Sequence, residues 1–430
     1  MSEAERDAMR RGWCPSTLRP METGDGWLVR LYPPGARLAP QQLRRVAELA
    51  LAHGNGLVEI SARASLQLRG VTPQSHPRLV GDLLADGLLD EPERDGPKRL
   101  TLVSPLAGLS CGDAAGPLDA FALAERIEAA VRTVEGLPPK CAVILDDGGP
   151  SSLDTVAGDL RLVGTASGQL VLGLPAGRWY GPLAEAEAPA LVAAILRRFA
   201  ALRRAAPERI RRLRDLPDEA LAGLVDLLEA AAPAARPAPR RAGLFPQGDG
   251  HVTALIGLPF GRSRAETLAA LAQAVGDEPA EIRPSPWRGL AFRGLSPDAA
   301  EALLALAAAQ GLIVADEDPR LSVQACAGSP ACTRAQTPAA ADAGLMADAL
   351  AALLREGLDL HVSGCAKGCA HPAAADLALT GRDGRYEVVF GGRAGDAPLA
   401  TLDLPALLAR LQPGQDWHAH LKTRGTGRDR

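Results

Sequence analysis

Apolar and polar positions in the first quarter of the chain alternate in patterns that predict strands and helices in a fixed order. The segment Gly26–Tyr32 has the pattern of a strand, and Pro33-Pro34-Gly35 turns the chain into a helix over Pro40–His53 with one apolar face. Two short strands and a second amphipathic helix follow, over Leu57–Ile60, Ser65–Val71 and Pro77–Leu89. The predicted unit is strand, helix, strand, strand, helix.

The same order of elements recurs from Val252. A strand, a Pro259-Phe260-Gly261 turn and a helix are followed by two strands and a helix, over Ala265–Val275, Glu281-Ile282, Leu290–Arg293 and Pro297–Gln310. Short sequences also match: Glu59-Ile60 resembles Glu281-Ile282, and Leu68-Arg69-Gly70 resembles Phe292-Arg293-Gly294. The shared order favours internal duplication. We expect two half-units related by a pseudo-two-fold axis to close into one larger domain.

A longer segment of alternating strand and helix patterns follows each half-unit, and a Pro-rich run over 231–241 separates the halves as a linker. We therefore predict an α+β fold with two duplicated, ferredoxin-like half-domains and two α/β domains. The predicted boundaries are 12–92 and 242–315 for the half-domains, and 93–231 and 316–422 for the α/β domains, the last of which carries most of the cysteines.

Composition and charge exclude several functional classes. The chain has 430 residues, 47% of them hydrophobic, and a formal net charge of −4, which gives no overall attraction to nucleic acid or to an anionic membrane. The N-terminal sequence is charged, and no apolar run reaches the roughly 18 to 20 residues that a membrane span needs. We expect a cytoplasmic protein with neither a nucleic-acid nor a membrane partner.

The seven cysteines are distributed unevenly, with four between positions 326 and 369. Cys326 and Cys332 are separated by five residues, and Cys365 and Cys369 by three. Four thiolates can hold either an iron–sulfur cluster or a tetrahedral zinc ion. The gaps differ from the two-residue gaps common in structural zinc sites, and the nearby glycines suit a cluster, so the pattern favours the cluster. The remaining cysteines are interpreted as ordinary buried thiols: Cys14, Cys111 and Cys141.

This cysteine pattern, together with the repeated half-units, resembles the nitrite and sulfite reductase family over nearly the whole chain. In that family the four cysteines hold a 4Fe-4S cluster, and the last one, at the position of Cys369, also bridges to the iron of sirohaem. The stretch 61–69 is similar to one that faces the macrocycle in the reductases, although Ala64 replaces the usual Gln. Arg99 and Lys140 match basic residues that bind the oxyanion substrate.

Two departures from the reductases point to one branch of the family. Tyr32 and Ala142 stand where the reductases carry cations. A site that reduces a small anion needs such cations for binding and proton delivery. The N-terminal Trp13-Cys14-Pro15 and the segment 360–372 resemble the precorrin-3B synthases of aerobic cobalamin biosynthesis. This resemblance implies a monooxygenase that hydroxylates precorrin-3A at C-20 with dioxygen, accompanied by lactone formation.

The resemblance also implies a site for a tetrapyrrole with many carboxylates, which arginines bind well. The candidate substrate-binding residues are Arg30, Arg63, Arg69, Arg99 and Lys140, with weaker candidates at Arg283, Arg288 and Arg293 in the second half. The branch is associated with a mononuclear non-haem iron, for which His361 and His371 are the candidate ligands. No residue is singled out as catalytic.

No dinucleotide fingerprint and no P-loop occurs in the sequence, so we expect electrons, nominally from NADH, to arrive through a separate reductase or ferredoxin. Two alternatives remain at this point. One is a sirohaem-dependent sulfite or nitrite reductase, and the other is a non-catalytic metal-binding or electron-transfer protein in which the cysteine site is structural.

Overall fold

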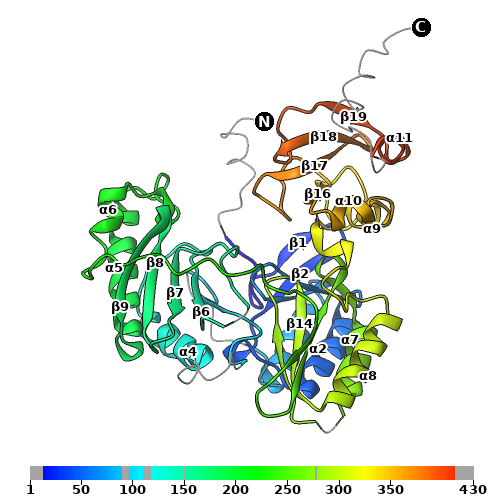
Figure 1. Ribbon diagram of the computed structural model, residues 1–430. Helices are drawn as coiled ribbons and strands as arrows, with labels where there is room; N and C mark the ends of the chain where they lie inside the picture. The colour runs from blue at the N-terminus through cyan, green and yellow to red at the C-terminus, as the bar shows by residue number, and fades with distance from the viewer. Residues whose placement is uncertain (1–12, 90–95, 110–117, 150, 277, 412–430) are drawn as a thin grey trace.

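The computed structural model describes residues 13–89, 96–109, 118–149, 151–276 and 278–411. Figure 1 shows a central body made from the N-terminal and middle segments, with one α/β domain beside it and a second, C-terminal one above. Three large hydrophobic cores correspond to these bodies, and the core of the central body draws on residues from both halves of the chain. The predicted α+β fold with duplicated half-units is confirmed.

The first half-unit has the predicted order of elements. Its elements are β1 (Met21–Thr23), β2 (Gly26–Leu31), α2 (Pro40–His53), β3 (Leu57–Ile60), β4 (Leu66–Val71) and α3 (His76–Ala85). Helix α2 has its predicted bounds, because Pro40 suits the first helical turn and Gly54 follows the last residue. Its buried side chains include Leu43, Val46 and Ala50, which form the apolar face expected from the sequence.

The second half-unit repeats this order. Its elements are β10 (Gly243–Pro246), β11 (Val252–Gly257), β12 (Arg262–Arg264), α7 (Ala265–Ala274), β13 (Glu281–Pro284), β14 (Gly289–Leu295) and α8 (Pro297–Ala309). The turns before α2 and α7 share a conformation that L-residues rarely adopt, since each has two consecutive residues with positive φ: Gly35 and Ala36 at 60° and 59°, and Phe260 and Gly261 at 54° and 77°. Matching strain at matching positions supports the duplication.

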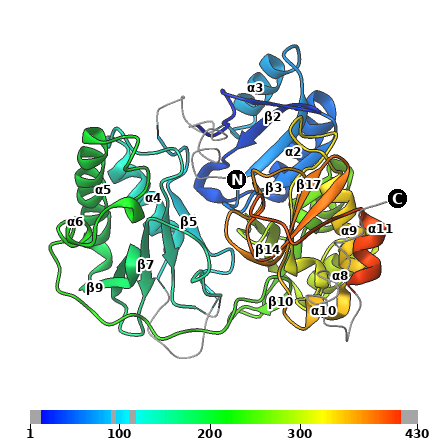
Figure 2. The ribbon, with the colours of Figure 1, turned by 90° about the horizontal axis from the view of Figure 1, so that it is seen from above.

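The two half-units exchange backbone contacts. Strand β12 of the second half-unit pairs with β3 of the first, so the sheet order is β1-β2-β4-β3-β12. In return, Leu38 of the first half-unit exchanges two hydrogen bonds, of 2.8 and 2.7 Å, with Ile282 on β13. Helices α2 and α7 pack against each other (Figure 1), and Figure 2 shows α2 beside strand β2 of the first sheet. The expected closure of two half-units into one domain is confirmed.

The strand register corrects one of the matches between the repeats. Glu59 pairs with Gln67, whereas Glu281 pairs with Arg293, the counterpart of Arg69. The equivalence of Glu59-Ile60 with Glu281-Ile282 is therefore wrong by two residues. The residue that corresponds to Glu59 is Arg283, which pairs with Ala291 two positions before Arg293.

The two α/β domains have the same sheet topology. The first contains β5 (Thr101–Val103), α4 (Ala120–Val131), β6 (Val143–Asp146), β7 (Leu160–Gly164), β8 (Leu170–Leu174), β9 (Arg178–Leu183), α5 (Ala188–Ala205) and α6 (Asp218–Ala222). The second contains β15 (Val323–Ala325), α9 (Ala339–Ala349), α10 (Ala351–Arg355), β16 (Leu360–Ser363), β17 (Ala375–Arg382), β18 (Arg385–Gly392), β19 (Ala400–Leu402) and α11 (Leu404–Arg410). In each, the first three strands are parallel and the last two are antiparallel additions.

Short 3-10 turns connect several elements: η1 (Pro34–Ala36), η2 (Pro175–Gly177), η3 (Glu185–Glu187), η4 (Leu213–Asp215), η5 (Pro259–Gly261) and η6 (Pro319–Ser322). Helix α6 ends at Ala222, because Gly223 follows it and the next segment runs in extended form beside β9. The expected linker over 231–241 is attached to the first α/β domain, since Arg236 pairs with the fully buried Asp146 of that domain at 2.6 Å. Among the described residues, no helix is long and apolar enough to cross a membrane.

Candidate functional site

The two cysteine pairs lie in neighbouring loops of the C-terminal domain. Cys326 and Cys332 follow β15, and Cys365 and Cys369 follow β16. Because β15 and β16 are adjacent and parallel, their carboxyl ends bring the two loops to the same edge of the sheet. The backbone N–H of Gly364 donates a hydrogen bond of 3.1 Å to the sulfur of Cys326, which joins the loops directly.

A close backbone approach sets the path of the first loop. Gly328 has a φ angle of +70°, and a Cβ there would lie 2.3 Å from the backbone nitrogen of Ala339, the first residue of α9. Only glycine permits this approach. The N-terminus of α9 therefore lies against the loop that carries Cys326 and Cys332, where its partial positive charge favours thiolates.

The four sulfur atoms share one electrostatic environment. Partial loss of hydration raises the pKa values of Cys365 and Cys369, and the thiols of Cys326 and Cys332 raise them further. Lys367 acts in the opposite direction on both. Four thiols in two neighbouring loops are the donor set that an iron–sulfur core takes, and they would have to draw together around it, since no three His, Cys, Asp or Glu side chains of the described residues already converge on one point.

Three of the candidate substrate-binding cations meet near the last cysteine. The guanidinium of Arg63 donates a hydrogen bond of 2.6 Å to the carbonyl of Lys140. Desolvation lowers the pKa of Lys140, and the nearby charges of Arg63 and Arg30 lower it further, while Cys14 and Cys369 oppose them. The charges of Arg30, Arg63 and Cys369 thus all act on Lys140, while the Arg30 guanidinium itself donates to Gln67 at 3.0 and 2.6 Å.

The other two candidates lie elsewhere. Arg99 lines a separate cavity of about 260 Å³ together with Tyr32 and donates to the carbonyl of Pro33. Arg69 is buried, and its guanidinium contacts Asp25 at 2.5 Å and the carbonyl of Ala331 at 2.8 Å. These contacts tie Arg69 to the cysteine loop.

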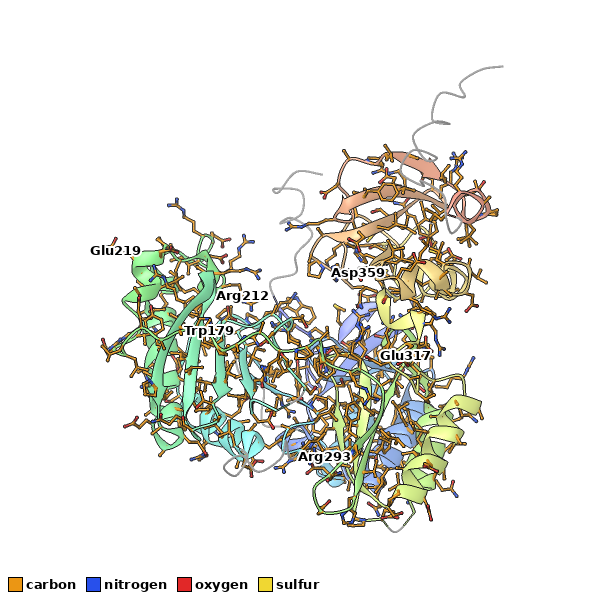
Figure 3. All side chains as sticks on the ribbon, in the orientation of Figure 1. Trp179, Arg212, Glu219, Arg293, Glu317 and Asp359 are labelled. Atoms are coloured by element: carbon orange, nitrogen blue, oxygen red, sulfur yellow. The ribbon has the colours of Figure 1, made fainter. Side chains whose placement is uncertain are left out.

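The second-half arginines separate into two groups. Arg283 and Arg293 both donate to the carbonyl of Ala107 in the first α/β domain, at 2.8 and 3.0 Å. Arg293 lies on the side of the central body that faces this domain (Figure 3). Arg288 instead donates at 2.9 Å to the carbonyl of Ala370, directly after Cys369.

The candidate histidines lie beside the second cysteine loop. His361 is completely buried on β16, and neither of its ring nitrogens has a hydrogen-bond partner. Desolvation lowers the pKa of His361 to about 3, and His371 and Arg288 contribute, so the imidazole is neutral. The ring centres of His361 and His371 are 5.6 Å apart, and His371 Nε2 lies 3.7 Å from a carboxylate oxygen of Asp359. Figure 3 places Asp359 at the lower edge of the C-terminal domain.

Sequence reasoning missed several residues of this region. Glu59 was noticed only as a repeat marker, yet its carboxylate contacts Arg69 and Arg262. Asp359 precedes His361 by two strand positions, and that spacing could have placed both side chains on one face of the strand. Cys14 and Cys141, expected to be ordinary thiols, are half-buried and buried, and Cys111 lies outside the described residues.

Comparisons with known proteins agree with this architecture. The sequence model of the nitrite/sulfite reductase ferredoxin-like half domain matches residues 19–86. The fold resembles the solved structure of the Mycobacterium tuberculosis NirA protein with a TM-score of 0.70 and 20% identity, covering 94% of this chain and 82% of NirA.

Curated relatives place the chain more narrowly. The hemoprotein beta-component of an NADPH sulfite reductase from Myxococcus xanthus is 30% identical over only 39% of this chain and 32% of its own length. A precorrin-3B synthase from Sinorhizobium sp is 37% identical over 94% of this chain and 88% of its own length. The chain therefore belongs to the precorrin-3B synthase branch of the nitrite and sulfite reductase family.

Proposed function

We propose that this protein is a precorrin-3B synthase, a cytoplasmic monooxygenase that hydroxylates precorrin-3A at C-20, with lactone formation, in aerobic cobalamin biosynthesis. The observation that carries the proposal is the 37% identity to a precorrin-3B synthase along nearly the whole chain. The cations beside Cys369 support it, because the substrate is a macrocycle with many carboxylates. In the net reaction, one atom of dioxygen enters the product and the other leaves as water, which requires two electrons and two protons.

The cations of the first half-unit and the first α/β domain would bind and orient the macrocycle. Arg30 and Arg63 present guanidinium groups, which pair with carboxylates in a bidentate manner. Lys140 adds a third charge, and its pKa is lowered first by desolvation and then by the charges of Arg63 and Arg30, which repel it. An anionic substrate relieves this repulsion. Arg99 lies in its own cavity and could hold a peripheral carboxylate of the same substrate.

The cysteines at 326, 332, 365 and 369 would hold a 4Fe-4S cluster, which supplies one-electron transfer when bound. We propose that the electrons originate from NADH and arrive through a separate reductase or ferredoxin. Lys367, between the last two cysteines, stabilises negative charge on both thiolates and so favours retention of an anionic cluster.

We further propose His361 and His371 as ligands of a mononuclear non-haem iron, with Asp359 as a carboxylate partner. The ring centres of the two histidines are 5.6 Å apart, and buried His361 has two unsatisfied nitrogens, which such an iron would engage. Among the described residues, no such triad of side chains already converges on one point. For both rings to bind one iron, the His371 ring would have to give up its contact with the carbonyl of Ala374.

The test is incubation of the reconstituted protein with precorrin-3A, dioxygen and an artificial reductant, followed by mass spectrometry. We expect a product heavier by one oxygen atom, labelled when ¹⁸O₂ is used. Unchanged substrate with a fully loaded cluster would contradict the proposal. Soret and long-wavelength absorption bands in the purified protein, with sulfite or nitrite reduction, would instead support a sirohaem reductase. A cluster without either activity would indicate an electron carrier.

A further inference from the structure

Three arginines of the central body donate hydrogen bonds into the cysteine loops of the C-terminal domain. Arg69 contacts the carbonyl of Ala331 at 2.8 Å, Arg262 that of Ala327 at 3.4 Å, and Arg288 that of Ala370 at 2.9 Å. Each carbonyl belongs to a residue adjacent in sequence to a cysteine: Ala327 follows Cys326, Ala331 precedes Cys332 and Ala370 follows Cys369. Three of the four cysteines are thus positioned by side chains from a different domain.

The carboxylate of Glu59 connects these arginines. It contacts Arg262 at 2.8 Å and Arg69 at 3.5 Å, and it accepts a hydrogen bond of 3.0 Å from Gln67. It also acts on Arg288 through its charge, raising the pKa that burial lowers. The Glu59 side chain is only 12% exposed, so solvent screens these interactions weakly. We call Glu59 with Arg69, Arg262 and Arg288 the Glu59 network.

The backbone around the network is arranged for close contact. The N–H of Gly24 donates 3.1 Å to the same Ala331 carbonyl that Arg69 contacts, and a Cβ on Gly24 would lie 2.2 Å from the carbonyl oxygen of Pro330. Arg288 has a φ angle of 64°, a conformation that non-glycine residues hold only when their surroundings impose it. The central body is therefore fitted against both loops.

Charge within the network matters for a bound cluster. Three guanidinium groups near the loops are balanced by Glu59 and, at Arg69, by Asp25. The potential of an iron–sulfur cluster depends on the net charge around it and on the hydrogen bonds of its loops. Removing the negative charge of Glu59 leaves a more positive surrounding, which favours the reduced and more negative state of the cluster.

We infer that Glu59 is the positioning residue of the cluster: it holds Arg69 and Arg262 in place and acts on Arg288 through its charge, and through these arginines the central body controls both the retention and the reduction potential of the cluster. The inference rests on the cluster of the proposed function, and not on the substrate or on dioxygen. It assigns to the first half-unit a role in electron transfer that is separate from binding of the macrocycle.

The test compares Glu59→Gln with Glu281→Gln. Glu281 lies where the central body meets the first α/β domain, its partners are Arg37 and Arg283, and it serves as a matched control. Midpoint potential is measured by a redox titration followed by electron paramagnetic resonance, and cluster loss is measured as the rate of iron release to a chelator. In Glu59→Gln we expect a more positive potential and roughly tenfold faster iron release. Glu281→Gln should match the parent protein in both.

Two further variants keep the inference falsifiable. If Glu59→Gln does not fold, Arg262→Gln, whose side chain is partly exposed, should show faster iron release. Glu59→Asp should restore the parent potential in part, because it keeps the charge. Equal potentials and release rates in Glu59→Gln and the parent would overturn the inference, as would equal changes in Glu281→Gln. Neither the redox titration nor the iron-release assay uses precorrin. Failure to form product would therefore contradict only the proposed activity, and not the role of Glu59.

Discussion

The two faces of the central body are built from equivalent residues but hold different domains. On the first face, Arg69 donates to a carbonyl of the cysteine loop after β15. On the second, its counterpart Arg293 donates to the carbonyl of Ala107, in the loop after the equivalent strand β5. At the centre, Glu59 on the first face corresponds to Arg283 on the second. The first face therefore has an acidic residue, Glu59, at the position where the second face has the cationic Arg283.

The difference shows how a duplicated scaffold can become asymmetric. On the second face, Arg283 donates directly to Ala107, stacks over the ring of Phe121 at 4.0 Å and pairs with Glu281 beside it on the same strand. On the first face, arginines contact the loop carbonyls while Glu59 balances their charge. The first face, on which Glu59 offsets the charge of the arginines, therefore holds the loops that carry the four cysteines.

The largest effect is expected at the cysteines themselves. Cys326→Ser should lose most of its iron and sulfide, because one of four thiolates is removed and Gly364 loses its sulfur acceptor. Chemical analysis of iron and sulfide in the purified variant provides the measurement. Cys14→Ser is the control and should keep its cluster; equal loss in both variants would show that the array is not the binding site.

Arg69→Met and Arg293→Met compare the two faces in stability. Arg69→Met leaves Asp25 and Glu59 without their buried partner, so unfolding in urea should show destabilisation of about 3 kcal/mol. Arg293→Met removes a hydrogen bond to a carbonyl and should cost about 1 kcal/mol. Equal losses would mean that the acidic centre of the first face contributes nothing.

Lys140→Met tests the cation group beside Cys369. Loss of one charged contact should weaken binding of an acidic tetrapyrrole about tenfold, measured by fluorescence quenching or calorimetry. Arg197→Met, on the exposed surface of α5, is the matched control and should bind like the parent. Unchanged affinity in Lys140→Met would remove this lysine from the substrate site.

The smallest effect concerns pH and two carboxyl groups, Asp25 in the first half-unit and Asp147 directly after β6 in the first α/β domain. Burial alone would raise the pKa of Asp25, but hydrogen bonds and charge from Arg69 bring it below 3.8, so Asp25 adds stability that is lost as pH falls through the folded pKa. Burial raises the pKa of Asp147 above 3.8, so its contribution is lost as pH rises through the folded pKa. In urea titrations, the Asp25→Asn variant should lose less stability than the parent protein as the pH falls.

Asp147→Asn should show the opposite dependence: its stability relative to the parent should increase as pH rises above 3.8. Parallel pH profiles for Asp25→Asn and Asp147→Asn would contradict the assignment of opposite pKa shifts to the two carboxyl groups.

Local signals predicted most of the elements and the cysteine site. Helix α2 was predicted with its observed bounds because proline, glycine and an apolar face all lie within its own sequence. The pairing of β12 with β3 was not predicted, since its three polar residues carry no strand pattern and their partners lie about two hundred residues earlier. Glu59 was missed for the same reason: its role depends on arginines that only the folded chain brings to it.

The exchanged strand has a consequence for the order in which the chain folds during synthesis. Without β12, strand β3 is the outer edge of the first sheet, with unpaired backbone groups along the stretch that contains Glu59. A nascent chain must therefore reach residue 264 before that edge is covered, and the four cysteines between 326 and 369 emerge later still. Ribosome-bound fragments that end before β12 should self-associate through this edge, and the surface that receives the cysteine loops is completed only shortly before those loops are made.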